Sequence, residues 1–159
     1  MDSKGIRNSF SRGLGAALFS AALPLFAQDV AVVDPKSASI KKVGTLITQL
    51  KSGTPGVVEI SVHGKTADGK VTTLASTNSA TVGQPSTSRD ADVVETSSLS
   101  IRNDGGVFDI KVPLKSSASQ TLGAAGVRLA GDGGLTLPAA KEQAIGIAKK
   151  IEQAMADMK

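Results

Sequence analysis

Six side chains along the sequence are suited to donating hydrogen bonds to a small anion. They are Ser61, Thr77, Arg89, Arg102, Lys111 and Arg128. Ammonium and guanidinium groups form charge-assisted hydrogen bonds with carboxylates, and the planar guanidinium can donate two parallel bonds. These residues are far apart in the sequence, so they would make a binding site only if the fold brings them to one surface.

Combinations of residues that are typical of catalysis are poorly represented. Asp90, Asp92 and Glu95 lie close together, but a hydrolytic carboxylate pair also needs a structured cleft that separates the two pKa values. The sequence has one His and no Cys, which excludes the usual zinc ligand sets. His63 and several Ser residues could supply two members of a triad, but no Gly-x-Ser-x-Gly motif accompanies them. We therefore expect no enzymatic activity, no metal site and no cofactor.

Alternating residues predict the strands that would carry the polar side chains. In GVVEISVHG, apolar residues occupy one face of the expected strand and mainly polar residues the other. The apolar face has Val58, Ile60 and Val62, and the opposite face has Val57, Glu59, Ser61 and His63. A turn at TADG follows, so we expect His63 to lie at the surface near this turn.

Two later strands place basic residues in the same way. In VFDIKVPL, Lys111 lies on the face opposite Phe108, Ile110 and Val112. In LGAAGVRLA, Arg128 lies opposite Ala125, Val127 and Leu129. Lys111 and Arg128 could therefore share one polar surface with Ser61 and Thr77, with Arg89 and Arg102 near its rim.

The remaining elements complete an α+β domain. Apolar residues at three-to-four spacing predict amphipathic helices over 35–51 and 138–158, and 56–77 reads as a β-hairpin. A five-stranded antiparallel sheet with both helices packed on one face gives every apolar surface a partner. The segment 77–94 is a long polar insertion between the second and third strands. A connection of this length favours a functional role.

The N-terminus predicts export. Residues 1–27 begin with Lys4, Arg7 and Arg12, continue into an apolar run and end at Ala27, as in a secretory signal peptide. The run is shorter than the roughly 20 residues that cross a bilayer. We expect a single domain over 28–159 in the periplasm or secreted, with no membrane span after cleavage of the signal.

Charge gives little support for a nucleic-acid partner. The expected signal holds three of the 18 Lys and Arg and one of the 14 Asp and Glu, so the formal charge falls from +4 to +2 on cleavage. Phe108 is the only aromatic residue after position 27. Single-stranded nucleic acids bind on aromatic stacking surfaces beside basic residues, so we expect no nucleic-acid partner.

The succession of motifs over 57–130 resembles extracytoplasmic Cache domains, the PAS-like sensors of chemoreceptors and sensor kinases. It comprises VEISVHGKTADGKVTTLAST, VGQPSTSRDADVV, GGVFDIKVPL and LGAAGVRLA. Gly83 and Asp90 match the spaced Gly and Asp of the family's loop, and Pro113-Leu114 matches the end of its fourth strand. This resemblance implies that the segment 77–94 closes as a lid over a small ligand on the sheet face opposite the N-terminal helix.

The resemblance also implies a role for Lys111, which stands where the citrate-sensor branch has a basic ligand-binding residue. Asp109 replaces a second basic residue of that branch, and Tyr and Trp are absent. We expect a small anion such as a carboxylate to be the ligand, and a membrane receptor or sensor kinase to receive the signal. A secreted structural or interaction domain without a ligand pocket is the alternative.

Overall fold

A computed structural model describes residues 29–156. The expected signal peptide over 1–27 and the last residues of the expected C-terminal helix, Met158 among them, lie outside the described residues. No helix within 29–156 has the length and apolar character needed to cross a bilayer.

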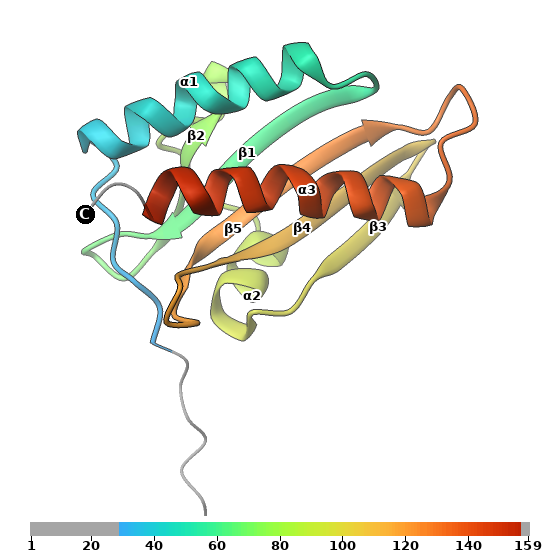
Figure 1. Cartoon of the computed structure of the whole chain (residues 1–159). Coiled ribbons are helices and arrows are strands. Elements are labelled where there is room, and N and C mark those ends of the chain that lie inside the picture. Colours follow the sequence, from blue (N-terminus) through green and yellow to red (C-terminus); the bar gives the residue numbers. More distant parts are fainter. Residues whose placement is uncertain (1–28, 157–159) are drawn as a thin grey trace, which may run out of the picture.

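Three α-helices and five strands make up the described part (Figure 1). In chain order they are α1 (Ala38–Gly53), β1 (Val57–Lys65), β2 (Val71–Ser76), the 3-10 helix η1 (Ser79–Thr81), α2 (Ser88–Thr96), β3 (Ser100–Asp104), β4 (Val107–Lys115), β5 (Thr121–Ala130) and α3 (Leu137–Ala156). The strands form one sheet in the order β2-β1-β5-β4-β3, with antiparallel neighbours throughout. The predicted five-stranded antiparallel sheet is confirmed.

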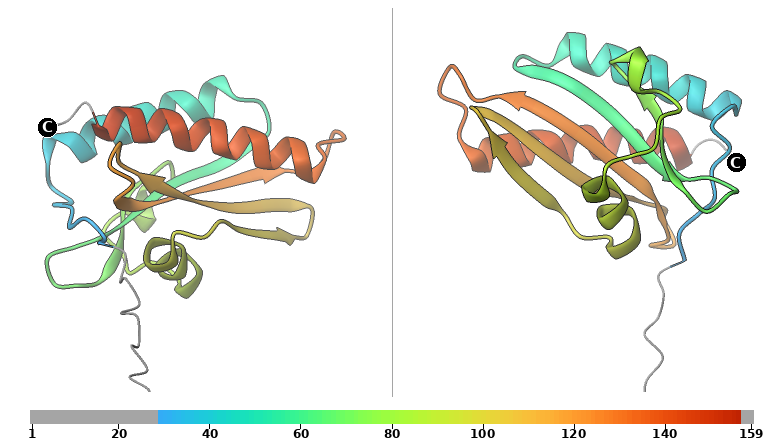
Figure 2. Two further views of the ribbon diagram at one scale, coloured as in Figure 1. Left: turned by 60° about the horizontal axis from the view of Figure 1, so that its bottom comes forward. Right: turned by 180° about the vertical axis from the view of Figure 1, so that it is seen from behind.

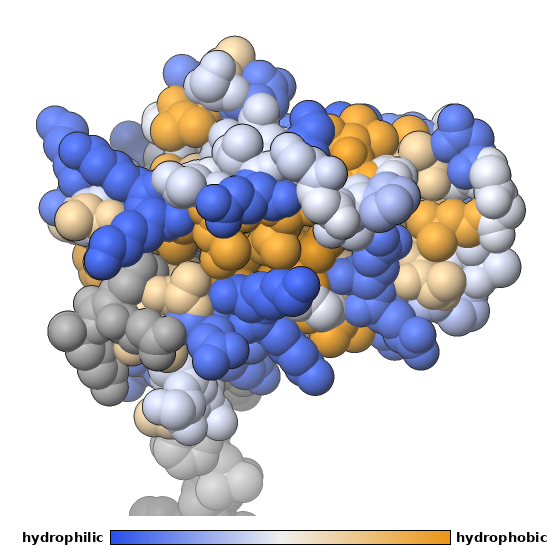
Figure 3. Space-filling model, turned by 45° about the horizontal axis from the view of Figure 1, so that its top comes forward, coloured by the Kyte–Doolittle hydropathy of each residue, from blue (hydrophilic) through white to orange (hydrophobic). Residues whose placement is uncertain are grey.

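Helices α1 and α3 cover one face of the sheet (Figures 1 and 2). Helix α1 packs on β1 and β2, α3 packs on β4 and β5, and the two helices contact each other. The core between them includes Ile47 of α1, Ile110 of β4, Val127 of β5 and Ile151 of α3. Apolar surface remains visible on this side among hydrophilic side chains (Figure 3). Both helices therefore lie on one face, as the sequence predicts.

Strand β1 differs from its predicted alternation at its beginning. Val57 is buried, whereas Val58 is 41% exposed, the reverse of the expectation. The pairing of β1 with β5 shifts its register between Val57 and Glu59, as at a β-bulge. A bulge adds one residue to one strand and so reverses the sidedness of the residues before it. Ile60 and Val62, which follow the bulge, face the core as predicted.

Helix α1 begins later than predicted. The sequence suggests a start at Pro35, but Ser37 is the N-cap, and its side chain accepts a hydrogen bond from the amide of Ile40. Asp34 instead accepts a bond from the amide of Lys36 in a preceding turn. Asp and Ser are both favoured N-cap residues. Ser37, which is nearer to the first buried position of α1, is the one that caps the helix.

The long polar insertion is largely structured. It carries η1 and α2, and α2 lies on the sheet face opposite α1 and α3, where it contacts β5, β4 and β1 (Figure 2). Val93 and Val94 of α2 pack with Ala124 of β5 in a small cluster separate from the main core. Segment 83–86 pairs with the outer edge of β2. The segment therefore lies over the sheet as predicted, and part of it forms the helix α2.

Candidate functional site

The sheet register aligns charged side chains in rows on the face beneath α2. One row runs from Glu59 on β1 through Arg128 on β5 to Asp109 on β4. The next row runs from Ser61 through Gly126 to Lys111. Residues paired directly across antiparallel strands project on the same side, so these side chains share one surface.

Gly126 allows Lys111 to lie across β5. A Cβ atom at position 126 would be 2.6 Å from Ser61 Oγ and 2.9 Å from Lys111 Nζ. Contacts this short do not occur between real atoms of these types, so with any other residue at this position Ser61 or Lys111 would have to shift. The absence of a side chain at Gly126 therefore helps to position Lys111 in the site.

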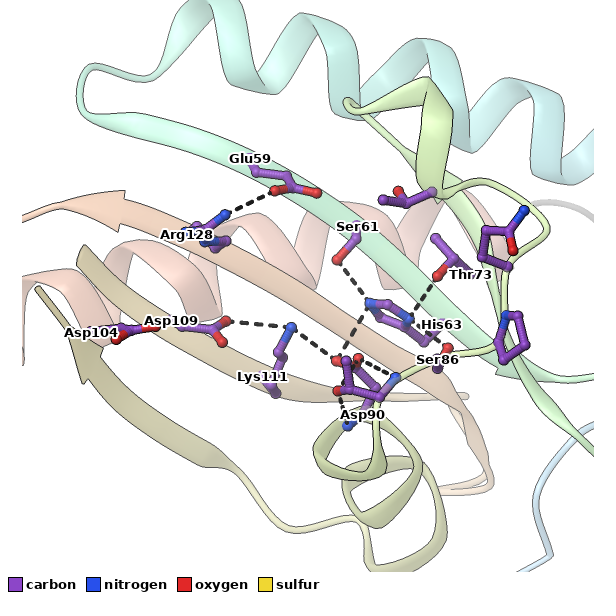
Figure 4. A pocket seen from close by; sticks show the side chains of 14 residues that line it. Glu59, Ser61, His63, Thr73, Ser86, Asp90, Asp104, Asp109, Lys111 and Arg128 are labelled. Carbon is purple, nitrogen blue, oxygen red and sulfur yellow. Dashed lines mark hydrogen bonds and ion pairs between the residues drawn. The ribbon is translucent and has the colours of Figure 1, made fainter.

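Lys111 is buried and lies between two carboxylates (Figure 4). Its Nζ is 2.9 Å from Oδ1 of Asp90 on α2 and 3.3 Å from Oδ1 of its strand neighbour Asp109. Lys111 is only 8% exposed, and Asp90 only 1%. Apart from this ammonium, neither Oδ1 atom has a hydrogen-bond partner in the described structure. The contacts are therefore charge pairs that leave acceptor capacity free.

Asp90 is positioned by the start of α2. Thr87 is the N-cap of this helix, and its hydroxyl and amide both donate to Asp90 Oδ2, at 2.6 and 3.1 Å. In return, the amide of Asp90 donates to the Thr87 hydroxyl. This reciprocal arrangement is a capping box, and it fixes the carboxylate at the third helical position so that Oδ1 points to the sheet.

His63 is buried beside this pair, which corrects the expectation of a surface residue. It is 5% exposed, because Thr73 of β2, Ser86 and Asp90 of α2 lie around its ring. Its Nε2 is 2.8 Å from Ser61 Oγ and 3.5 Å from Asp90 Oδ1. Its Nδ1 is 2.8 Å from Ser86 Oγ and 3.4 Å from Thr73 Oγ1.

Burial determines the charge of His63. Removal of the imidazole from water lowers its pKa to about 4, although Asp90 acts in the opposite direction. The pKa of Asp90 lies below its ordinary value. Burial alone would raise it, but His63, the Thr87 hydroxyl and Lys111 favour the carboxylate. At neutral pH the cluster therefore holds an uncharged imidazole, a carboxylate and an ammonium.

Two further ion pairs flank the cluster. Arg89 of α2 donates to Asp109 Oδ2 at 2.8 Å and to Ser100 Oγ of β3, and so ties α2 to the sheet. Arg128 Nη1 is 3.3 Å from Glu59 Oε2, and its side chain is 43% exposed. Arg128 is therefore the more accessible of the two cations in the rows.

These residues line a partly open pocket of about 300 Å³ between the sheet, α2 and segment 81–87 (Figure 4). This volume lies at the lower end of the range of about 300 to 1,000 Å³ for small-molecule sites. Its lining has four carboxylates, from Glu59, Asp90, Asp104 and Asp109, and two cations, from Lys111 and Arg128. Within 29–156, no group of three or more His, Cys, Asp or Glu is placed to hold a metal ion.

The structure brings together only part of the predicted site. Ser61, Lys111 and Arg128 line the pocket, as the alternation of their strands implies. Arg89 contributes through its ion pair with Asp109 and lies outside the lining. Arg102 is on the exposed edge strand β3, where its Nη2 is 3.8 Å from Asp104 Oδ1, and it does not line the pocket.

Thr77 also lies outside the pocket lining. Its hydroxyl accepts a hydrogen bond from the amide of Ile60 at 3.0 Å, where it closes the end of the β1-β2 ladder.

The acidic half of the site was missed in the sequence. Asp90 and Glu59 were not among the predicted ligand-binding residues, and Asp109 counted only as a departure from the Cache pattern. A detectable signal for Asp90 was present, because Thr87 and Asp90 have the spacing of a capping box just before the apolar pair Val93 and Val94.

Comparison with known proteins identifies the fold class. No protein-family model and no curated protein matches the sequence. The GAF domain/HD domain protein from Geobacter sulfurreducens superposes with a TM-score of 0.56 at 10% identity, over 76% of this chain and 94% of that chain. The chain has a GAF-like fold. A GAF domain from an Acinetobacter phosphoenolpyruvate-protein phosphotransferase gives a TM-score of 0.55 at 11% identity, over 76% and 84% of the two chains.

An enzyme is also similar in fold to this chain. The type II free methionine-R-sulfoxide reductase from Thermoplasma acidophilum superposes with a TM-score of 0.52 at 12% identity, over 78% of this chain and 96% of that chain. At these identities the comparisons establish the fold alone. They confirm the coarser part of the predicted resemblance, a fold of the GAF and PAS-like kind. Membership of the Cache family in particular stays a prediction.

Proposed function

We propose that this protein is a GAF-like binding domain whose small-molecule ligand lies in the pocket between the sheet and α2. The observation that carries this proposal is the pocket of about 300 Å³ on this sheet face, whose wall holds the buried pair of Lys111 and Asp90. Small-molecule sites are typically concave and place a few convergent polar groups in their walls, as this pocket does.

Lys111 and Arg128 are the two cations of the lining that could bind an anionic ligand. A carboxylate, the class expected from the sequence, would contact both cations. Each of them already pairs with protein carboxylates, namely Asp90 and Asp109 for Lys111, and Glu59 for Arg128. An anionic ligand would therefore have to compete with these carboxylates for Lys111 and Arg128.

We propose that the domain acts by binding and not by catalysis. Ser86, His63 and Asp90 lie in contact, with Ser86 Oγ and Asp90 Oδ1 on opposite ring nitrogens. A general base acts best when its pKa is near the working pH, and the pKa of His63 is lowered to about 4. A reductase mechanism through a protein thiol would need a cysteine, which the sequence lacks.

Hydrolysis of a simple activated ester tests this part of the proposal. The wild-type protein and the Ser86→Ala variant should hydrolyse 4-nitrophenyl acetate at the same slow rate. A rate that saturates with substrate in the wild type and disappears in Ser86→Ala would establish catalysis by the Ser86 and His63 pair.

A ligand screen by thermal shift, followed by calorimetry on each hit, tests binding. A compound that binds only the folded state must raise its thermal stability. Arg128→Met should raise the dissociation constant of a hit by about tenfold or more, because the variant loses a hydrogen bond to a charged group. Lys115→Met, an exposed lysine on the same sheet, is the matched control and should leave it unchanged. The secreted interaction domain without a pocket becomes the better description if no compound binds saturably.

Export to the periplasm or beyond is a separate proposal, supported by the charged start and short apolar run of 1–27. The mass of the intact protein recovered from the periplasm should correspond to a chain that begins at Gln28. Recovery of the full-length mass, with Met1 retained, would contradict it.

A further inference from the structure

We infer that the pocket takes a small, uncharged polyhydroxyl compound, which forms hydrogen bonds with the hydroxyl side chains around His63. This inference rests on the proposed function and specifies the ligand class of the same site. It departs from the anion that the sequence favours, because the partners of Lys111 and Arg128 became apparent only in the structure.

The charges of the site compensate one another, which is the first argument. Each of the four carboxylates in the lining pairs with a Lys or Arg. The pairs are Glu59 with Arg128, Asp90 with Lys111, Asp109 with Arg89, and Asp104 with Arg102. The imidazole of His63 is uncharged at neutral pH. A charged ligand would have to disrupt one of these pairs, whereas an uncharged ligand leaves all of them intact.

Uncharged polar groups in the pocket wall are the second argument. Three hydroxyls surround the imidazole of His63 (Figure 4). Ser61 Oγ is 2.8 Å from Nε2, and Ser86 Oγ is 2.8 Å from Nδ1. Thr73 Oγ1 is 3.4 Å from Nδ1. These four side chains all line the pocket, and Gln84 adds an amide beside them.

The position of the proton on His63 determines what these hydroxyls can offer a ligand. Asp90 Oδ1 is 3.5 Å from Nε2, and a carboxylate only accepts, so this neighbour favours the proton on Nε2. Nδ1 is then an acceptor, and the nearer hydroxyl, that of Ser86, donates to it. Ser86 Oγ can therefore still accept, while the hydroxyls of Ser61 and Thr73 can still donate. A ligand hydroxyl, which both donates and accepts, complements this set.

The position of Phe108 favours an open-chain compound over a ring sugar. Phe108 is the only aromatic residue after position 27, and it is buried on the helix-covered face of the sheet. An aromatic side chain provides the large flat contact area on which a sugar ring could lie. A short open-chain polyol binds through its hydroxyls alone and needs no such platform.

NMR titration of the protein with matched four-carbon probes tests the inference. The probes are erythritol, 1,4-butanediol, which lacks the two central hydroxyls, succinate and 1,4-diaminobutane. We expect saturable binding of erythritol, and binding of 1,4-butanediol weaker by about tenfold or more, because two neutral hydrogen bonds are lost. We expect no saturable binding of the two charged compounds. The affinity for erythritol should not change between about 0.05 and 0.5 M sodium chloride, since salt screens interactions between charges.

Removal of single hydroxyls locates the binding. Ser61→Ala and Ser86→Ala should each weaken erythritol binding by about three- to tenfold, the effect of one neutral hydrogen bond. Ser52→Ala removes a hydroxyl from an exposed position of α1 outside the lining and should have no effect. Thermal unfolding of each variant shows that it is folded at the temperature of the titration.

The outcomes separate this inference from the proposed function. Saturable binding of succinate or 1,4-diaminobutane in this pocket, without binding of erythritol, would overturn the polyol inference and leave the binding domain standing. Erythritol affinity that is equal in Ser61→Ala, Ser86→Ala and Ser52→Ala would overturn the assignment to the hydroxyls around His63. An absence of saturable binding by erythritol and by every compound of the wider screen would overturn both proposals.

Discussion

Lys111 on β4 crosses β5 and contacts Asp90 on α2, with its Nζ 2.9 Å from the carboxylate Oδ1. Together with Arg89 and Asp109, this pair joins the sheet to α2. Both residues are buried, so the free energy of the pair depends on both charges being present. Alternation alone places Lys111 on a polar surface, and the structure corrects this, because α2 buries the side chain.

Removal of one partner should therefore be strongly destabilising. We expect Lys111→Met to lower the free energy of unfolding by about 3 to 5 kcal/mol, the usual loss when one member of a buried ion pair is left uncompensated. Urea denaturation measures it. The double variant Lys111→Met with Asp90→Asn should regain part of the loss. A double variant as unstable as the sum of its single changes would show that the pair is not coupled.

The pH dependence of stability should report the buried His63. Its pKa is about 4 in the folded protein against 6.5 for the free imidazole, so the unfolded chain binds the proton more tightly. The folded state is thus favoured above pH 6.5, and this contribution is lost as the pH falls towards 4. Between pH 7 and pH 5 the free energy of unfolding should fall by about 2 kcal/mol.

A His63 variant is the control for this titration. In His63→Gln the difference between pH 7 and pH 5 should largely disappear, because Asp90, whose pKa is lowered, titrates only at more acidic pH. An equal fall in the variant and the wild type would assign the pH dependence to other groups.

A side chain at position 126 should destabilise the protein. In Gly126→Ala the new Cβ would displace Lys111 or Ser61, and overpacking of this kind costs about 1 to 3 kcal/mol. Gly44→Ala is the matched change, since it lies within α1 with open space around it and should stabilise the protein by about 0.5 to 1 kcal/mol. Chemical denaturation of the two variants should therefore give shifts of opposite sign.

Phe108 tests the main core. It is buried on the helix-covered face of β4, as its alternation with Lys111 predicts. Phe108→Ala should lower the free energy of unfolding by about 3 to 5 kcal/mol. A loss below about 1 kcal/mol in urea would place this side chain outside the core.

The regular part of the fold could be predicted because its signals are local. Alternation in β4 and β5 and the three-to-four spacing in α1 and α3 each report which face of an element is apolar. The bulge between Val57 and Glu59 could not be seen in this way, because an added residue depends on the pairing partner rather than on the strand itself.

Only part of the site could be predicted, for a similar reason. Polar alternation identifies Ser61, Lys111 and Arg128 as facing away from the core, but it is the same for a wet surface and for a pocket wall. The burial of His63 and the approach of Asp90 depend on α2, which is distant in sequence from both strands. Such tertiary contacts leave no periodic pattern in the sequence.

Helix α2 rests on Val93, Val94 and Ala124, a cluster apart from the one that joins α1, α3 and the strands. The contacts that hold it down are Arg89 with Asp109, the pair at Lys111, and Ser97 with Thr121. Segments with their own small cluster open at a lower free energy than the whole protein. Local breathing of this one helix, while the sheet stays intact, would set the residence time of any bound molecule.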